Sequence, residues 1–165
     1  MIDLGAAIAL LSRARVEFIV VGGVAAIAHG SARLTFDLDV VYARDAANLT
    51  RLAEALAQVR PYLRGAPPGL PFRWDAATIR RGLNFTLTTT LGDLDLIGEA
   101  TGGGTYEALL PHSRPLEAFG VPFQCVDLER LIQLKRAAGR PKDLEALAEL
   151  ETLLEEVRRH RDPKA

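Results

Sequence analysis

The stretch EFIVVGGVAAIAHGSARLTFDLDVVY, residues 17–42, decides the fold, because it holds two strand patterns joined by a glycine turn and a short helix. Residues 18–21 are apolar and mostly β-branched, and the pair Gly22-Gly23 follows them, which predicts a buried strand and a tight turn. A short helix is expected from about Val24. Glycines let the backbone approach a ligand closely, and the free N–H groups at a helix start attract anions. The turn is therefore a candidate phosphate site.

The second strand pattern in this stretch, residues 37–41, carries two aspartates. Since side chains alternate along a strand, Asp37 and Asp39 share one face, and Leu38 and Val40 share the other. The pattern therefore predicts a strand with one acidic face and one buried face.

Length and composition favour one domain. The chain has 165 residues, of which 48% are hydrophobic, and no run of about 18 uncharged apolar residues suggests a membrane span. We expect a single domain over residues 1–165, with a core at about 17–126 and a C-terminal helical part at about 127–160. The single Cys125 excludes an internal disulfide, and the N-terminus lacks the basic opening of a secretory signal, so a cytoplasmic location is expected. The net charge of −1 offers no global attraction to nucleic acid.

A second acidic strand is predicted further along the chain. Residues 83–91 alternate between apolar and polar side chains, as in a half-buried strand, and Gly92 permits a turn. Residues 93–97 then place Asp93 and Asp95 on one face, so this acidic face can meet the earlier one. We prefer Asp95 to Asp93 as the third carboxylate, because apolar residues flank Asp95 on both sides.

The remaining patterns predict a mixed sheet with flanking helices, an α/β (α+β) fold. Asp3, Asp45 and Asp127 are expected to cap helices, residues 64–71 to form a loop, and residues 116–126 to form one or two strands. A last, longest helix should begin at Arg140-Pro141. Its expected buried stripe consists of Leu144, Leu147, Leu150, Leu154 and Val157. Seven cationic residues were candidates for a common basic surface: Arg64, Arg73, Arg80, Arg81, Arg136, Arg140 and Lys142.

Three converging carboxylates require a counter-charge. Like charges about 4 Å apart repel by roughly 4 kcal/mol at an effective dielectric constant near 20. Hard oxygen ligands on Asp37, Asp39 and Asp95, without a cluster of histidines or cysteines, favour Mg²⁺ or Mn²⁺ over zinc. Magnesium in such sites commonly bridges carboxylates and substrate phosphates, which the glycine turn would help to hold.

These residues resemble a known motif. Gly22-Gly23, the 13 residues 24–36 and Asp37-Leu38-Asp39-Val40 are similar to the signature of the nucleotidyltransferase (polymerase-β-like) superfamily. The strand around Asp95 resembles its third-carboxylate strand. Residues 29–37 and 134–143 further resemble the AbiEii-type toxin branch and related small nucleotidyltransferases.

The resemblance implies a Mg²⁺-dependent or Mn²⁺-dependent enzyme with a nucleoside triphosphate (NTP) as substrate. Asp37, Asp39 and Asp95 would be the catalytic metal ligands, with Asp95 also deprotonating an acceptor hydroxyl. Six residues would contact the nucleotide: Gly22, Gly23, Arg33, Thr35, Lys135 and Lys142.

The implied reaction transfers a nucleoside monophosphate to an RNA 3′ end, such as that of tRNA, or to a protein hydroxyl. The protein would then be the toxin of a toxin–antitoxin pair, with a cognate antitoxin as partner. The alternative is a nucleotide-binding or partner-binding module that keeps the fold without turnover.

Overall fold

The computed structural model describes residues 1–162, so residues 163–165 of the expected domain lie outside the described part. The helices of the described part differ widely in length, and α7 is the longest. They are α1 (Leu4–Arg13), α2 (Gly22–Ala28), α3 (Ala46–Ala57), α4 (Ala76–Arg81), α5 (Tyr106–Leu109), the 3-10 turn η1 (Leu110–His112), α6 (Leu128–Ala138) and α7 (Pro141–Arg161).

The strands form a mixed sheet, as predicted. They are β1 (Phe18–Val21), β2 (Asp37–Tyr42), β3 (Tyr62–Leu63), β4 (Asn84–Thr89), β5 (Gly92–Ile97), β6 (Glu99–Ala100), β7 (Gly104–Thr105), β8 (Ser113–Ala118) and β9 (Val121–Val126). Within residues 1–162, seven of them make one sheet in the order β3-β4-β5-β2-β1-β9-β8, and β6 pairs with β7. The pairs β2–β5 and β1–β9 are parallel, and the other neighbours in the large sheet are antiparallel.

Local sequence signals explain where several helices begin. Asp3, Asp45 and Asp127 cap α1, α3 and α6 as expected, each accepting a hydrogen bond from the backbone N–H three residues later. Gly139 ends α6 in the left-handed conformation at φ 63°, which costs glycine little. Caps of this kind depend only on neighbours in the chain, so the sequence predicted them well.

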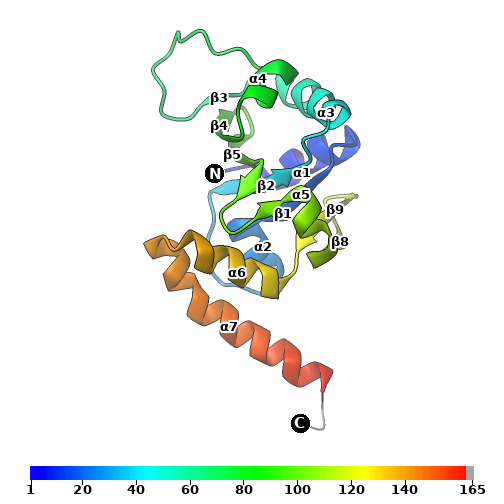
Figure 1. Cartoon of the computed structure of the whole chain (residues 1–165), viewed down its shortest axis with the longest axis vertical. Helices are drawn as coiled ribbons and strands as arrows, with labels where there is room; N and C mark the ends of the chain where they lie inside the picture. The colour runs from blue at the N-terminus through cyan, green and yellow to red at the C-terminus, as the bar shows by residue number, and fades with distance from the viewer. Residues whose placement is uncertain (163–165) are drawn as a thin grey trace.

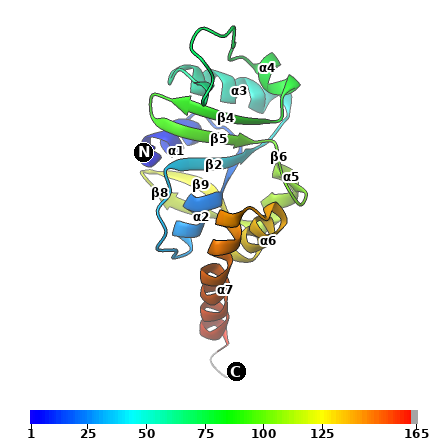
Figure 2. The same cartoon turned by 90° about the vertical axis from the view of Figure 1, so that its left-hand side faces the viewer.

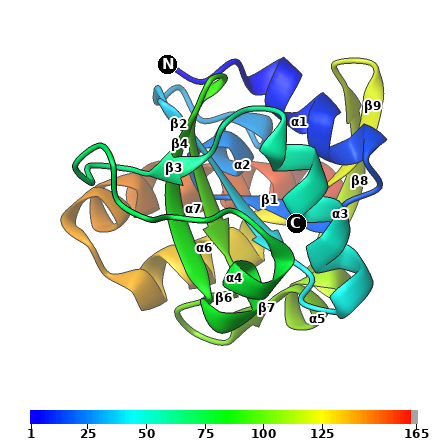
Figure 3. The same ribbon diagram turned by 90° about the horizontal axis from the view of Figure 1, so that it is seen from above.

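The core is one cluster of apolar residues from the sheet and from the helices packed on it, among them Ile8, Leu49 and Leu131. Leu38 and Val40 on β2 and Leu96 on β5 are fully buried. Helices α1 and α3 lie on one side of the sheet and α6 on the other (Figure 3). The acidic face of β2 points away from Leu38 and Val40, so it faces the side on which α6 lies.

The expected buried stripe of α7 is wrong at both ends. Leu150 is fully buried, but Leu144 is 52% exposed and Val157 is 39% exposed. Figures 1 and 2 show that α7 carries the C-terminus away from the sheet, which accounts for the exposure of Val157 near its end. Leu147 and Leu154 are partly buried against the core, so the stripe is buried only in its middle.

Two predicted boundaries also shift. Helix α2 begins at Gly22 rather than near Val24, and β4 covers residues 84–89 rather than 83–91, with Leu83 exposed. In the described part of the chain, no helix is both long enough and apolar enough to cross a membrane.

Candidate active site

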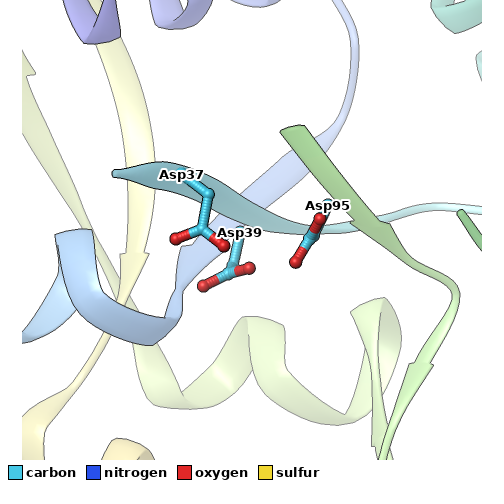
Figure 4. Close-up of side chains that lie close together, drawn as sticks. All are labelled: Asp37, Asp39 and Asp95. Atoms are coloured by element: carbon cyan, nitrogen blue, oxygen red, sulfur yellow. The ribbon is translucent and has the colours of Figure 1, made fainter. Parts of the chain in front are cut away.

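Three carboxylates from two neighbouring strands converge on one face of the sheet. In the parallel pair β2–β5, Asp39 lies opposite Asp95, and alternation places Asp37 on the same face as Asp39. One carboxylate oxygen from each of Asp37, Asp39 and Asp95 lies within 4.8 Å of the other two. Figure 4 shows the three side chains turned toward a common point. The structure thus brings together the three aspartates that the strand patterns singled out.

Asp93 occupies a different position. It lies opposite Asp37 in the strand register, yet it does not belong to the group of converging oxygens among the described residues. Its side chain is 42% exposed, against 25% for Asp95. The geometry therefore favours Asp95 as the third carboxylate.

The central carboxylate, Asp39, is poorly tolerated as an anion in the metal-free protein. Burial, followed by the charges of Asp37 and Asp95, raises the pKa of Asp39 to about 7, although the nearby charge of Lys142 lowers it. A cation among the three carboxylates would remove this repulsion and restore the ionised form. The electrostatics therefore suit a divalent metal ion.

Arg64 holds the third carboxylate. Its Nη2 lies 2.8 Å from Asp95 Oδ1 and donates to the carbonyl oxygen of Leu87 at 2.7 Å, while its Nε lies 3.3 Å from Asp93 Oδ2. Arg64 follows β3 directly, and the Pro/Gly-rich loop begins there. This arginine fixes the orientation of Asp95 and neutralises part of the acidic face.

The glycine pair makes room for the protein's own side chains. A Cβ on Gly22 would lie 2.1 Å from Asp39 Oδ2, and a Cβ on Gly23 would lie 2.8 Å from Thr35 Oγ1. Thr35 Oγ1 in turn lies 3.2 Å from Asp37 Oδ1, within hydrogen-bond distance. The absence of side chains at the turn thus lets Asp39 and Thr35 pack against the start of α2, and Thr35 orients Asp37.

A cavity of about 330 Å³ adjoins the carboxylates. One wall is the sheet and the other is α6 with the first turn of α7. The lining residues are Val21, Gly22, Asp39, Asn84, Phe85, Thr86, Asp95, Leu96, Ile97, Glu99, Ala100, Thr101, Leu131, Leu134, Lys135, Ala138, Arg140 and Asp143. The acidic cluster therefore opens onto a concave space of the size usual for small-molecule sites.

Two cations share a buried carboxylate beside this cavity. Asp143 accepts hydrogen bonds from Arg140 Nε at 2.6 Å and Nη2 at 3.2 Å, and Lys135 Nζ lies 3.6 Å from Asp143 Oδ1. Burial alone would raise the pKa of Asp143, but the hydrogen bonds and charges of these partners outweigh it and lower that pKa. Asp143 thus fixes the positions of Lys135 and Arg140, both of which line the cavity.

The structure places the other predicted nucleotide contacts differently. Lys142 is exposed at the start of α7, where its charge acts on Asp39. Arg33 donates to the carbonyl oxygen of Glu145 on α7 at 2.9 Å and does not line the cavity. Lys135 and Gly22 line the cavity, whereas Gly23, Thr35, Arg33 and Lys142 do not.

Four of the seven residues of the expected basic surface are paired with carboxylates. Arg64 pairs with Asp95, Arg73 with Asp75, Arg136 with Glu151 and Arg140 with Asp143. Among the described residues, Arg80, Arg81 and Lys142 make no such pair, so part of the set stays available to a polyanionic partner.

Sequence reasoning missed Asn84 and Asp143 as part of this site and did not connect Arg64 with the carboxylates. The alternation of residues 83–91 did place Asn84 and Thr86 on one face, but nothing in the sequence showed that this face continues the acidic one. For Arg64, no local pattern indicates the partner, and for Asp143 only the pairing with the neighbouring Arg140 is local, whereas that with Lys135 on α6 is not.

No protein-family model and no curated protein matches this chain. A solved structure does: a candidate nucleotidyltransferase from Thermotoga maritima is similar over 92% of this chain and 96% of its own, with a TM-score of 0.52 and 16% identity. At this identity the similarity establishes the fold alone. The chain therefore has a nucleotidyltransferase fold, as predicted from Gly22-Gly23 and the aspartate strands. The more specific resemblance to the AbiEii-type branch stays a prediction from the sequence.

Proposed function

We propose that this protein is a nucleotidyltransferase that depends on a divalent cation and transfers a nucleoside monophosphate from an NTP to a hydroxyl group. The observation that carries the proposal is the convergence of Asp37, Asp39 and Asp95 within 4.8 Å at the mouth of a cavity. The nucleotidyltransferase fold and the candidate nucleotidyltransferase that shares it add support.

The three aspartates fit Mg²⁺ or Mn²⁺. They offer hard oxygen ligands only, and burial together with the charges of Asp37 and Asp95 raises the pKa of Asp39 even with Arg64 on Asp95 and Lys142 nearby. Asp37, Asp39 and Asp95 would hold the metal, which when bound would neutralise charge on the triphosphate and polarise the phosphoryl group.

The chain's own residues account for the remaining chemistry. Asp95 accepts the proton of the acceptor hydroxyl, whose oxygen then forms a bond to the α-phosphorus. The bond between the α-phosphorus and the oxygen bridging to the β-phosphate breaks, and pyrophosphate leaves in line with the attack. Thr35 holds Asp37, and Arg64 holds Asp95, so that both carboxylates are oriented before substrate arrives.

The cationic side of the cavity suits the triphosphate. Lys135 and Arg140 line the cavity, and the charges of Asp39 and Asp95 both raise the pKa of Arg140, after the larger effect of its hydrogen bond to Asp143. Arg140 therefore lies within electrostatic reach of the acidic cluster. We assign the phosphates to the space between the two groups, with Gly22, Gly23 and Lys142 as further contacts.

The acceptor that we propose is an RNA 3′ end, such as that of tRNA, or a protein hydroxyl. The toxin role, with a cognate antitoxin as partner, rests on the resemblance of residues 29–37 and 134–143 to the AbiEii-type branch. Since most arginines of the expected basic surface are paired with carboxylates, the structure gives an RNA acceptor no preference over a protein.

The Arg64–Asp95 contact favours one alternative, a nucleotide-binding or partner-binding module without turnover. An arginine on Asp95 satisfies the third carboxylate without a metal ion. In such a module the cavity would bind nucleotide while the acidic cluster stayed inactive.

Label transfer separates the two functions. The protein is incubated with each α-labelled NTP, Mg²⁺ or Mn²⁺, and either tRNA or total cell protein. The proposal predicts transfer of label to one of the acceptor pools, lost by at least about 10²-fold in Asp37→Ala and Asp39→Ala, since the metal site supplies several kcal/mol of transition-state stabilisation.

The matched control is Asp162→Ala, which removes an exposed carboxylate at the end of α7. Binding of an NTP without transfer to either pool supports the module instead. If wild-type protein binds neither metal nor NTP, the enzyme and the nucleotide-binding module are both wrong, and only the partner-binding module is left.

A further inference from the structure

We infer that Asn84 selects the base of the nucleotide by donating a hydrogen bond from Nδ2 to the base edge. This inference rests on the proposed function, because it assigns the nucleoside to the part of the cavity that the carboxylates and phosphates leave free. The observations behind it are the position of Asn84 in the sheet, the fixed orientation of its amide and the apolar walls beside it.

Asn84 lies at the right distance from the carboxylates for a base contact. In the antiparallel pair β4–β5, Thr86 lies opposite Asp95 and Asn84 lies opposite Ile97. Two residues along a strand span about 7 Å, so Asn84 lies on the face of Asp95 but one step further along. That step is on the scale of the ribose that separates an α-phosphate from its base.

The amide of Asn84 can turn only its donor toward a ligand. Its Oδ1 accepts hydrogen bonds from the N–H groups of Gly98 at 2.8 Å and Glu99 at 3.5 Å. These two donors fix which end of the amide is oxygen. Within residues 1–162, Nδ2 has no hydrogen-bond partner, and Asn84 lines the cavity.

The walls around Asn84 suit the flat faces of a base. Leu131, Leu134 and Ala138 on α6 line one side of the cavity, and Ile97 on β5 lies on the sheet side. Apolar surfaces of this kind accept the face of any base, so discrimination between bases falls to polar groups at the edge. Asn84 supplies such a group.

The experiment compares dissociation constants for ATP, GTP, CTP and UTP, measured with Mg²⁺ by calorimetry. Asn84→Asp keeps an oxygen for the N–H of Gly98 but replaces the donor by an acceptor. The added negative charge weakens the binding of all four triphosphates alike, so the readout is the ratio of the dissociation constants for different bases. We expect that ratio to change by about tenfold or more, because the protein loses one hydrogen bond to the base edge.

Gln133→Glu is the charge control, since it adds the same charge on an exposed position of α6 outside this cavity. It should leave the ratio unchanged. Asn84→Ala removes donor and acceptor together and should flatten the base preference without adding charge. Melting curves of each variant show that the fold is retained.

An unchanged ratio in both Asn84 variants overturns this inference and leaves the proposed function intact. The inference is also overturned if the Asn84 variants lose affinity equally for all four ribonucleoside triphosphates but not for a 2′-deoxyribonucleoside triphosphate. That result would assign Asn84 to the sugar. If the wild-type protein binds no NTP, the proposed function itself is wrong.

Discussion

Arg64 Nη2 lies 2.8 Å from Asp95 Oδ1, so one of the three carboxylates in the candidate site is already held by a cation. Arg64 comes from the segment after the edge strand β3, and Asp95 comes from the middle of the interior strand β5, with β4 between these two strands. A metal ion at the cluster therefore has to share Asp95 with Arg64 or displace it. Arg64 both orients the third carboxylate and weakens it as a ligand.

Replacing Arg64 should separate these two effects. Arg64→Ala removes hydrogen bonds to Asp95 and to the Leu87 carbonyl, so we expect the metal-free protein to lose about 1–2 kcal/mol of unfolding free energy. Mn²⁺ should bind more tightly, because the cluster gains negative charge. Thermal melts with and without Mn²⁺ measure both. Arg73→Ala, which removes an exposed ion pair with Asp75, is the control and should change neither stability nor Mn²⁺ affinity. Weaker Mn²⁺ binding in Arg64→Ala would show that the orientation of Asp95 matters more than its charge.

Asp39 should make stability depend on pH. Because its pKa is about 7 in the folded protein and near the ordinary 3.8 when unfolded, the folded state holds a proton between these values that the unfolded state has released. Stability from this group is therefore full below about pH 4 and is lost as pH rises through about 7. Denaturant unfolding at pH 5 and pH 8 without metal should show the fall. Asp39→Asn should remove it and be more stable than wild type at pH 8; equal pH dependence in both proteins would contradict the assignment.

Metal binding should follow the same titration in the opposite sense. Mn²⁺ requires the ionised carboxylate, so its affinity should increase as pH rises toward and past 7. Below pH 7, binding of Mn²⁺ should release the proton of Asp39. Calorimetry in two buffers of different ionisation enthalpy counts the proton. An affinity that is flat between pH 6 and pH 8 would be inconsistent with a protonated Asp39.

Gly22 should tolerate no side chain. In Gly22→Ala the backbone at φ +65° costs about 1–2 kcal/mol, and the new Cβ clashes with Asp39 Oδ2 at 2.1 Å. Gly120→Ala has a similar φ of +74° but no atom within 4 Å of the new Cβ, so it isolates the backbone cost. We expect both to lower the melting temperature and only Gly22→Ala to impair metal binding and transfer. Equal metal affinities would mean that Asp39 moves freely.

Asp143 should matter for nucleotide binding through its two cations. Asp143→Asn leaves the mostly buried Lys135 without its partner, which should cost about 1–3 kcal/mol of stability. Because Lys135 and Arg140 lose their anchor, KM for the NTP should rise more than kcat falls. Glu145→Gln, which removes the exposed partner of Arg33, serves as control and should leave both constants unchanged. An effect of Asp143→Asn on kcat alone would place Asp143 in the chemical step.

The fold followed from local patterns to a large extent. The β-branched run before Gly22, the alternation around Asp37 and Asp95, and the capping aspartates each act through near neighbours in the chain, so each was readable without a structure. The stripe of α7 was not, because burial of Leu144 and Val157 needs a facing surface that the spacing of leucines does not supply.

The sequence by itself pointed to the nucleotidyltransferase fold through its resemblance to the motif of that superfamily. It also singled out the three aspartates, because strand alternation constrains which residues share a face. Only the tertiary structure decided that Arg64 holds Asp95 and that Asn84 borders the same cavity. These relations join residues far apart in the chain. They depend on strand order, register and the placement of α6, none of which is encoded in a local pattern.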